Sequence, residues 1–107
     1  MIKMKSIIFV AAMLGLLLVS NSAVFAADGA ALYKAKLCFT CHGADANTPL
    51  LPTYPKLAGQ NAPYLIQQVK DIRDGKRASG LTNAMKPLVA NVSDEEIAAI
   101  AEWIAAQ

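Results

Sequence analysis

The pentapeptide Cys38-Phe39-Thr40-Cys41-His42 contains both cysteines and the single histidine of the chain. Two cysteines separated by two residues, with a histidine directly after the second, form the C-x-x-C-H pattern of covalent c-type haem attachment. The thiols can add to the vinyl groups of a haem, and the histidine can ligate its iron. The pattern therefore predicts one haem c per chain, covalently held by Cys38 and Cys41, with His42 as an iron ligand.

Other chemistries also use paired cysteines, namely thiol-disulfide exchange, structural zinc and an ordinary disulfide. A thioredoxin-like enzyme needs a strand before the motif, and none is visible. Zinc needs four ligands, whereas the soft ligands here are only Cys38, Cys41 and His42. A disulfide would not explain the histidine. A thiol-disulfide or zinc module is kept as the non-haem alternative.

The N-terminal segment has the features of a secretory signal peptide. Lys3 and Lys5 precede an apolar run over 7–19, and in Val24-Phe25-Ala26 the small residues Val24 and Ala26 favour cleavage after Ala26. The run is shorter than the roughly 20 residues of a membrane span. We therefore expect a signal peptide over 1–26 and a single mature domain over 27–107. The mature protein is then periplasmic and not a membrane protein, and an uncleaved anchor is the alternative.

Charge and composition narrow the function further. The formal charge of +2 comes from Lys3 and Lys5, so the mature part is close to neutral and lacks the basic field of a nucleic-acid-binding protein. Alanine is the commonest of its apolar residues, which leaves few large side chains for a core. A domain this small usually needs a disulfide, a metal or a cofactor to be stable.

The mature sequence predicts an all-α fold of short helices and long loops. Asp28 is a good N-cap for a helix reaching about Cys38, with Leu32 and Tyr33 facing the core. A second helix is expected between Asn61 and Gly75. The prolines within 44–55 exclude a regular element there, and 76–91 is polar and broken.

A third helix begins at Ser93, which with Glu96 forms a capping-box pattern. Helical spacing predicts buried faces on the second and third helices, namely Leu65, Val69 and Ile72, and Ile97, Ile100, Ala101 and Ile104. Loops this long in a small domain are expected to wrap a ligand.

Two further residues are candidates for the same site. Met85 is the only methionine outside the predicted signal peptide, and a thioether is a natural sixth ligand to haem iron. The plain alternative is that Met85 fills the core. Pro55 is a candidate because its carbonyl could orient His42, as ligating histidines require.

Several motifs follow one another in a recognisable order. They are Gly29 and Tyr33, Cys38-Phe39-Thr40-Cys41-His42-Gly43, Pro55-Lys56-Leu57-Ala58-Gly59-Gln60, Tyr64-Leu65, Asp71-Ile72 with Gly75, Met85, and Ser93-Asp94-Glu95-Glu96-Ile97-Ala98 with Trp103. With these motifs the chain resembles a class I c-type cytochrome, most closely one domain of the two-domain dihaem cytochromes of bacterial periplasms. The resemblance covers essentially all of 27–107 and implies a cytochrome c domain there, with the cytochrome c fold wrapped around one haem.

The resemblance implies thioether bonds at Cys38 and Cys41 and axial ligation by His42 and Met85. It also implies that the Pro55 carbonyl accepts a hydrogen bond from His42 and that Leu57 packs against the haem. The first and last helices would cross at Gly29, with Tyr33 and Trp103 packed nearby. Dihaem relatives have two attachment motifs where this chain has one, which implies a monohaem protein or one partner in an assembly.

The function expected is electron transfer without catalysis, because no acid/base pair, nucleophile or phosphate loop is visible. Donors would be a quinol-cytochrome c reductase or a periplasmic dehydrogenase, and acceptors a terminal oxidase or reductase. Alternatives are a haem sensor, a peroxidase-like enzyme with an open sixth position, or an electron-transfer subunit of a dehydrogenase complex. The basic residues between Lys70 and Lys86 have three possible roles. They form a solvated face, or they steer an acidic redox partner, or one of them, Arg77, neutralises a haem propionate.

Overall fold

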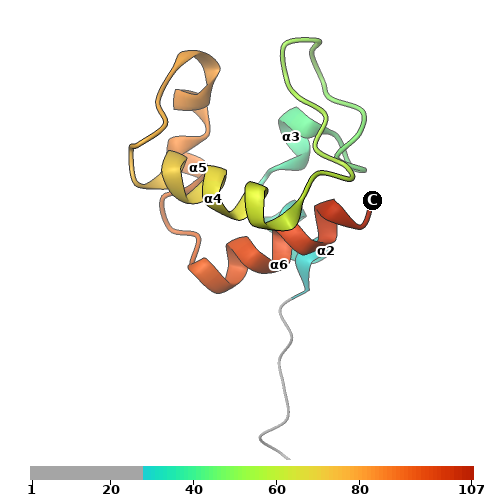
Figure 1. The fold of residues 1–107 in the computed structure, drawn as a ribbon. Helices are drawn as coiled ribbons and strands as arrows, with labels where there is room; N and C mark the ends of the chain where they lie inside the picture. Colours follow the sequence, from blue (N-terminus) through green and yellow to red (C-terminus); the bar gives the residue numbers. More distant parts are fainter. Residues whose placement is uncertain (1–27) are drawn as a thin grey trace, which may run out of the picture.

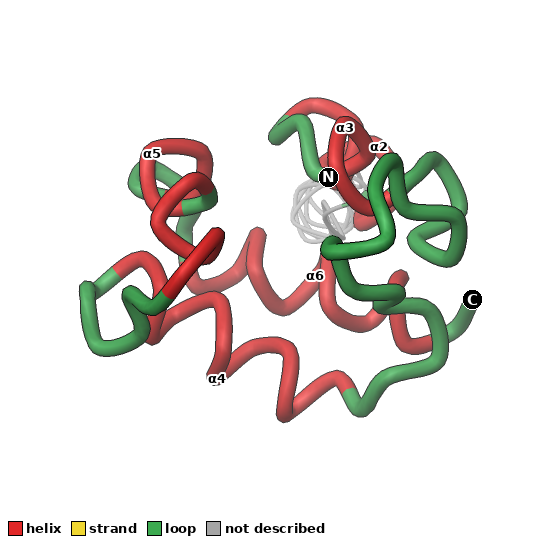
Figure 2. The backbone as a smooth tube through the Cα atoms, turned by 90° about the horizontal axis from the view of Figure 1, so that it is seen from above, coloured by secondary structure: helices red, strands yellow, loops and turns green. Residues whose placement is uncertain are grey.

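The computed structural model describes residues 28–107, so the predicted signal peptide over 1–26 lies outside the described part. The elements are α2 (Gly29–Ala35), α3 (Phe39–His42), α4 (Ala62–Arg73), the 3₁₀ helix η1 (Gly80–Ala84), α5 (Lys86–Val89) and α6 (Asp94–Ala105). Over residues 28–107 the chain has helices and loops and no strand (Figure 2). The all-α prediction is confirmed. No helix in this range is long and apolar enough to cross a membrane.

Helix α6 is the base on which the rest of the domain is assembled. Both α2 and α4 pack against it, whereas η1 and α5 rise on one side and the 44–55 loop on the other (Figure 1). The predicted face of α6 is buried, and so are Leu65 and Ile72 of α4. Val69 is only partly buried. The apolar spacing therefore located the core correctly.

The crossing of α2 over α6 depends on the missing side chain of Gly29. A Cβ at this position would overlap the Ala99 carbonyl oxygen and the Trp103 Cβ. Beside the crossing, the rings of Tyr33 and Trp103 pack with centroids 4.8 Å apart and planes inclined by 42°. Tyr33 is 2% exposed, so this contact belongs to the core.

Local hydrogen bonds fix where the helices begin. Asp28 Oδ1 accepts from the Ala31 N–H at 3.1 Å at the start of α2. The predicted capping box of α6 is present, because Ser93 and Glu96 exchange two bonds of 3.1 Å each. Arg73 then ties the end of α4 to the start of α6 by donating to the Val92 carbonyl and to Asp94 at 3.1 and 2.8 Å.

The first helix is shorter than predicted. It ends at Ala35 rather than near Cys38, and Leu37 follows with a φ of 65°. The N–H groups of Leu37 and Cys38 donate back to the carbonyls of Lys34 and Tyr33 at 3.0 and 3.1 Å. This pattern is a Schellman C-cap with leucine in place of the usual glycine. It redirects the chain so that α3 can begin, which helix propensity alone could not indicate.

The 76–91 segment is also more regular than predicted, because it contains η1 and α5. Gly80 and Pro87 stand at the beginnings of these short helices, where glycine and proline are tolerated. The prediction that 76–91 is broken rested on Gly80 and Pro87, although each of them marks the start of a helical turn.

We expect Gly29→Ala to lower the free energy of unfolding by about 1–3 kcal/mol, because the new methyl group would force α2 away from α6. The effect runs against helix propensity, by which alanine is better than glycine by about 1 kcal/mol. Urea unfolding followed by circular dichroism measures it. Ala30→Leu, on the exposed side of the same turn, is the matched control and should stay within about 0.5 kcal/mol. A Gly29→Ala protein as stable as the wild type would contradict the close approach.

We also expect the free energy of unfolding to fall at acid pH, because Asp94 and Glu96 then become protonated. The hydrogen bond from Arg73, together with Lys70, lowers the pKa of Asp94, and the Ser93 backbone N–H, together with Lys36, lowers that of Glu96. A carboxyl whose folded-state pKa is lowered stabilises the fold above its unfolded pKa of about 4 and loses this contribution as the pH falls further.

Urea unfolding at a series of pH values tests this expectation. The unfolding free energy of the wild type should decline below about pH 4, and that of Asp94→Asn should decline less. Glu102→Gln, an exposed change on the same helix, should keep the wild-type slope. Identical slopes in Asp94→Asn and the wild type would show that the pairing of Asp94 with Arg73 does not affect stability.

Candidate functional site

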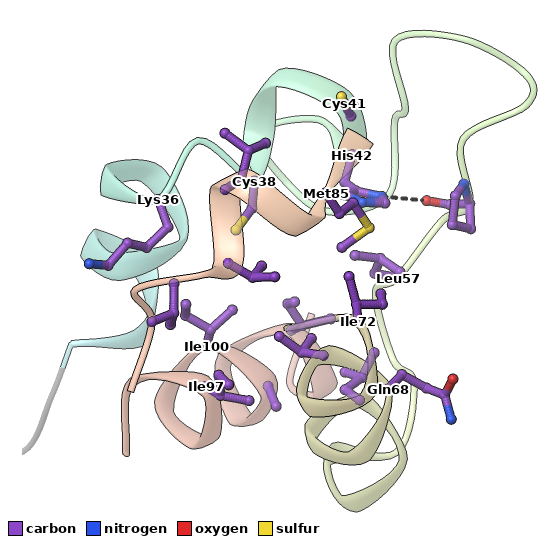
Figure 3. A pocket seen from close by; sticks show the side chains of 18 of the residues that line it. Lys36, Cys38, Cys41, His42, Leu57, Gln68, Ile72, Met85, Ile97 and Ile100 are labelled. Atoms are coloured by element: carbon purple, nitrogen blue, oxygen red, sulfur yellow. Dashed lines mark hydrogen bonds between the residues drawn. The ribbon is translucent and has the colours of Figure 1, made fainter. Parts of the chain in front are cut away.

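All six predicted site residues surround one cleft between α3, the 44–55 loop, and the η1–α5 segment. Two adjoining cavities make up this cleft. We call the one of about 250 Å³ that is lined by residues of α4 and α6 the inner compartment, and the one of about 490 Å³ that is lined by Thr53, Tyr54 and residues of η1 the outer compartment. Cys41, His42, Pro55 and Met85 line both compartments, and Cys38 and Leu57 line the inner one. Figure 3 shows His42, Met85 and Leu57 entering the cavity from different elements. A cleft of this combined size is suited to a cofactor, for which about 300–1,000 Å³ is usual.

The His42 ring is held in one tautomer. It is 6% exposed, and its Nδ1 donates to the Pro55 carbonyl oxygen at 2.9 Å, the contact dashed in Figure 3. A carbonyl can only accept, so Nδ1 carries the hydrogen and Nε2 keeps its lone pair. This is the arrangement of a histidine prepared to ligate a metal, with the second nitrogen oriented by an acceptor.

The position of Pro55 depends on how the preceding loop closes. Ala46 is fully buried, and its carbonyl accepts from the N–H groups of Leu57 and Ala58 at 2.8 and 3.0 Å. The Leu50 N–H donates to the Cys41 carbonyl at 3.0 Å. The bonds to Ala46 join the two ends of the loop to each other, and the bond to Cys41 ties the loop to the attachment motif, so Pro55 is brought opposite His42.

Two residues on either side of the motif hold the chain around it. The Tyr33 hydroxyl donates to the Gly43 carbonyl at 2.6 Å. Burial raises the pKa of Tyr33 to about 12, so this hydroxyl remains a donor at any ordinary pH. Gly43 itself has a φ of 86°, and a Cβ there would overlap the Thr48 carbonyl oxygen. A glycine is therefore needed directly after His42.

The two cysteines are free thiols lining the inner compartment, with Cys38 at the N-cap of α3 and Cys41 within the helix. Burial raises the pKa of the Cys38 thiol, the reverse of the low value that thiol-disulfide enzymes require. Within residues 28–107, no three side chains of His, Cys, Asp or Glu are grouped to hold a metal ion. The described geometry thus gives the exchange and zinc alternatives no support.

Met85 lies at the junction of η1 and α5, and the backbone on both sides of it is fixed. Its N–H donates to the Thr82 carbonyl at 3.0 Å, and its own carbonyl accepts from Leu88 and Val89 at 2.9 and 3.1 Å. The side chain is partly buried and its sulfur is drawn on the cavity side in Figure 3. The geometry brings Met85 and His42 to the same cavity from separate elements.

Sequence reasoning missed several polar residues of the cavity wall, among them Lys36, Gln60 and Gln68. Gln68 follows the buried Leu65 by three positions, so helical spacing placed it at the edge of the buried stripe. That signal could have found it. Lys36 had no such signal, because it lies in the Schellman cap that ends α2, and this cap was not predicted.

Comparisons with known proteins agree on one family. The family model described as cytochrome c oxidase, cbb3-type, subunit III, matches residues 25–104. The chain is 47% identical to cytochrome c4 of Pseudomonas aeruginosa over 94 residues, covering 88% of this chain and 44% of that protein. It is 38% identical to cytochrome c-553 of Nitratidesulfovibrio vulgaris, covering 94% of this chain and 97% of that protein.

The solved structure of cytochrome c4 from Acidithiobacillus ferrooxidans has the same fold, with a TM-score of 0.61 and 26% identity over 74% of this chain and 47% of that one. This chain belongs to the class I c-type cytochromes. Its fold is the cytochrome c fold, and the family is one of electron-transfer haem proteins. The chain spans about half the length of the cytochromes c4 that it matches.

The residues of this cytochrome fit a haem c. Two free thiols lie at the spacing of the attachment motif, and a histidine with a free Nε2 directly follows the second. The inner wall is mainly hydrocarbon, from Leu65 and Ile72 of α4 and Ile97, Ile100 and Ile104 of α6. Such a wall would keep water from a bound haem, which the two thiols would attach and His42 would ligate.

We expect Tyr33→Phe to lower the unfolding free energy of this cytochrome by about 1–2 kcal/mol, because the Gly43 carbonyl loses its donor while remaining half-buried. Denaturation followed by far-ultraviolet circular dichroism measures the change. Tyr64→Phe removes the hydroxyl of an exposed tyrosine and should stay within about 0.5 kcal/mol. Equal stability of the two variants would remove the Tyr33 hydroxyl from the support of the attachment motif.

Proposed function

We propose that this chain is an exported, periplasmic electron carrier with one haem c, bound through Cys38 and Cys41 and ligated by His42 and Met85. The observation that carries the proposal is the pairing of two suitable ligands on one apolar cavity. His42 reaches it with Nδ1 held by Pro55, and Met85 reaches it from the η1–α5 segment. Leu57 would pack against the ring from the loop.

A bound haem supplies an iron that changes between Fe(III) and Fe(II). His42 would hold the metal through Nε2, and the Pro55 carbonyl would strengthen its donation by accepting from Nδ1. Met85 would favour the reduced metal, because a thioether is a soft ligand that raises the potential. The isoleucines of α6 would keep water away, so that electron transfer needs little rearrangement of the surroundings.

The proposed pathway is exchange with other redox proteins rather than conversion of a substrate. Donors would be a quinol-cytochrome c reductase or a periplasmic dehydrogenase, and acceptors a terminal oxidase or reductase. The periplasmic location rests on the signal peptide predicted over 1–26. The cytochromes c4 are about twice as long as this chain, so the proposal includes the possibility that the chain is one partner in an assembly.

We expect Met85→Ala to abolish the weak sulfur-to-iron charge-transfer band of the oxidised protein, as the resemblance to His/Met cytochromes implies. The midpoint potential should fall by on the order of 0.2 V, within the roughly 0.8 V over which axial ligands tune haem. Visible spectroscopy during a redox titration measures both effects in one experiment.

Leu88→Ala is the matched control, because Leu88 lines both compartments near Met85 but has no sulfur. It should keep the charge-transfer band. An unchanged band in Met85→Ala would take Met85 off the iron. Ready binding of carbon monoxide to the reduced wild type at neutral pH would favour a sensor or peroxidase-like protein with an open sixth position.

A further inference from the structure

The turn after α4 brings Arg77 back beside the helix. The Asp71 carbonyl accepts from the N–H groups of both Lys76 and Arg77, at 2.8 and 3.0 Å. Gln68 lies one helical turn before Asp71 on the same face, and its Oε1 accepts from Arg77 Nη1 at 3.1 Å. The guanidinium is therefore held on one side, and its remaining N–H groups are available to another acceptor.

Arg77 is distinct among the charged residues of the cleft. It lines both compartments, whereas Lys36 and Lys56 line only the inner one. Lys36 is already paired with Glu96 at 3.4 Å. Within residues 28–107 no carboxylate forms an ion pair with Arg77, and the Asp71 carboxylate accepts from Gln67 at 2.8 Å instead.

The chemistry of the outer compartment favours an anion. None of the described residues lining either compartment is acidic. Beside Arg77, the outer compartment is lined by the hydroxyl residues Thr53, Tyr54, Ser79 and Thr82. A guanidinium with several hydroxyls and no competing carboxylate is well suited to bind a carboxylate, and arginine can do so with two parallel hydrogen bonds.

We propose that Arg77, positioned by Gln68, binds a propionate carboxylate of the haem at the outer compartment. The inference rests on the proposed function, because the carboxylate belongs to the haem. An unpaired propionate would favour the oxidised iron by its negative charge, and Arg77 offsets that charge. Arg77 thereby raises the midpoint potential and keeps the propionate ionised to a lower pH.

The test compares Arg77→Gln with Lys76→Gln in the haem-loaded protein. Lys76→Gln removes the same charge one residue away, at a position that does not line the cleft. Midpoint potentials are measured by spectroelectrochemical titration between about pH 5 and 8, the range into which a propionate that has lost Arg77 should move. In Arg77→Gln the equilibrium constant for reduction by a fixed reference couple should fall roughly 3- to 10-fold. Its dependence on pH should become steeper in the same range. Lys76→Gln should change this constant by less than about twofold.

Two further variants keep the test decisive if Arg77→Gln binds haem poorly. Arg77→Lys retains the charge and should recover most of the wild-type potential. Gln68→Ala should shift the potential in the same direction as Arg77→Gln, but less. If Arg77→Gln is obtained, a pH profile that superimposes on that of Lys76→Gln overturns the inference. If it is not, a Gln68→Ala protein whose potential and pH profile superimpose on those of Lys76→Gln overturns it.

A change confined to the salt dependence of electron transfer, with no change in potential, would also overturn the inference and place Arg77 at a partner surface. Failure of the proposed function looks different. Wild-type protein matured in a host competent for c-type haem would then be colourless, whereas failure of the Arg77 inference alone leaves a coloured protein whose charge-transfer band depends on Met85.

Discussion

The hydrogen bond from His42 Nδ1 to the Pro55 carbonyl joins the two halves of the site, and most of the surrounding structure serves to place its two ends. On one side, the Schellman cap at Leu37 ends α2 early, and α3 then presents Cys38, Cys41 and His42 from a single turn. On the other side, the buried Ala46 carbonyl closes the loop that brings Pro55 into position. Because a carbonyl only accepts, this one bond determines which ring nitrogen can reach a metal.

The core explains why such a small chain can hold this geometry. Helices α2 and α4 both rest on α6, and the isoleucines of α6 form the core and the wall of the inner compartment at once. The interior is therefore continuous with the site. In the proposed holoprotein the cofactor would complete a core that alanine-rich helices leave incomplete, which agrees with the long loops on either side of the cleft.

The basic residues in and near the cleft differ in the partners that they bind. Arg73 and Lys36 form ion pairs with Asp94 and Glu96, and these pairs hold helices together. Arg77 lies only four residues beyond Arg73, yet it is turned toward the cleft and bound to a neutral amide. The difference comes from the turn at Gly75, since the two backbone bonds to Asp71 reverse the chain there.

The sequence by itself determined the elements whose signals are local. The C-x-x-C-H motif, the Asp28 and Ser93 caps and the apolar stripes of α4 and α6 each depend on spacing within a few turns, and the structure contains them where they were expected. The pairing of His42 with the Pro55 carbonyl was proposed from the residues and implied by the resemblance to the family, and the structure contains that bond as well. The order of motifs also indicated the family, which the comparisons show.

Only the tertiary structure decided where α2 ends, how the loop closes and which polar residues line the cleft. Leu37 adopts a left-handed conformation that no propensity would assign to leucine, because packing of α3 on the rest of the domain requires the turn. The Ala46 carbonyl and the Arg77–Gln68 pair likewise join residues that are brought together only by folding. Long-range contacts of this kind leave no periodic trace in the sequence, so the geometry of the site had to come from the fold.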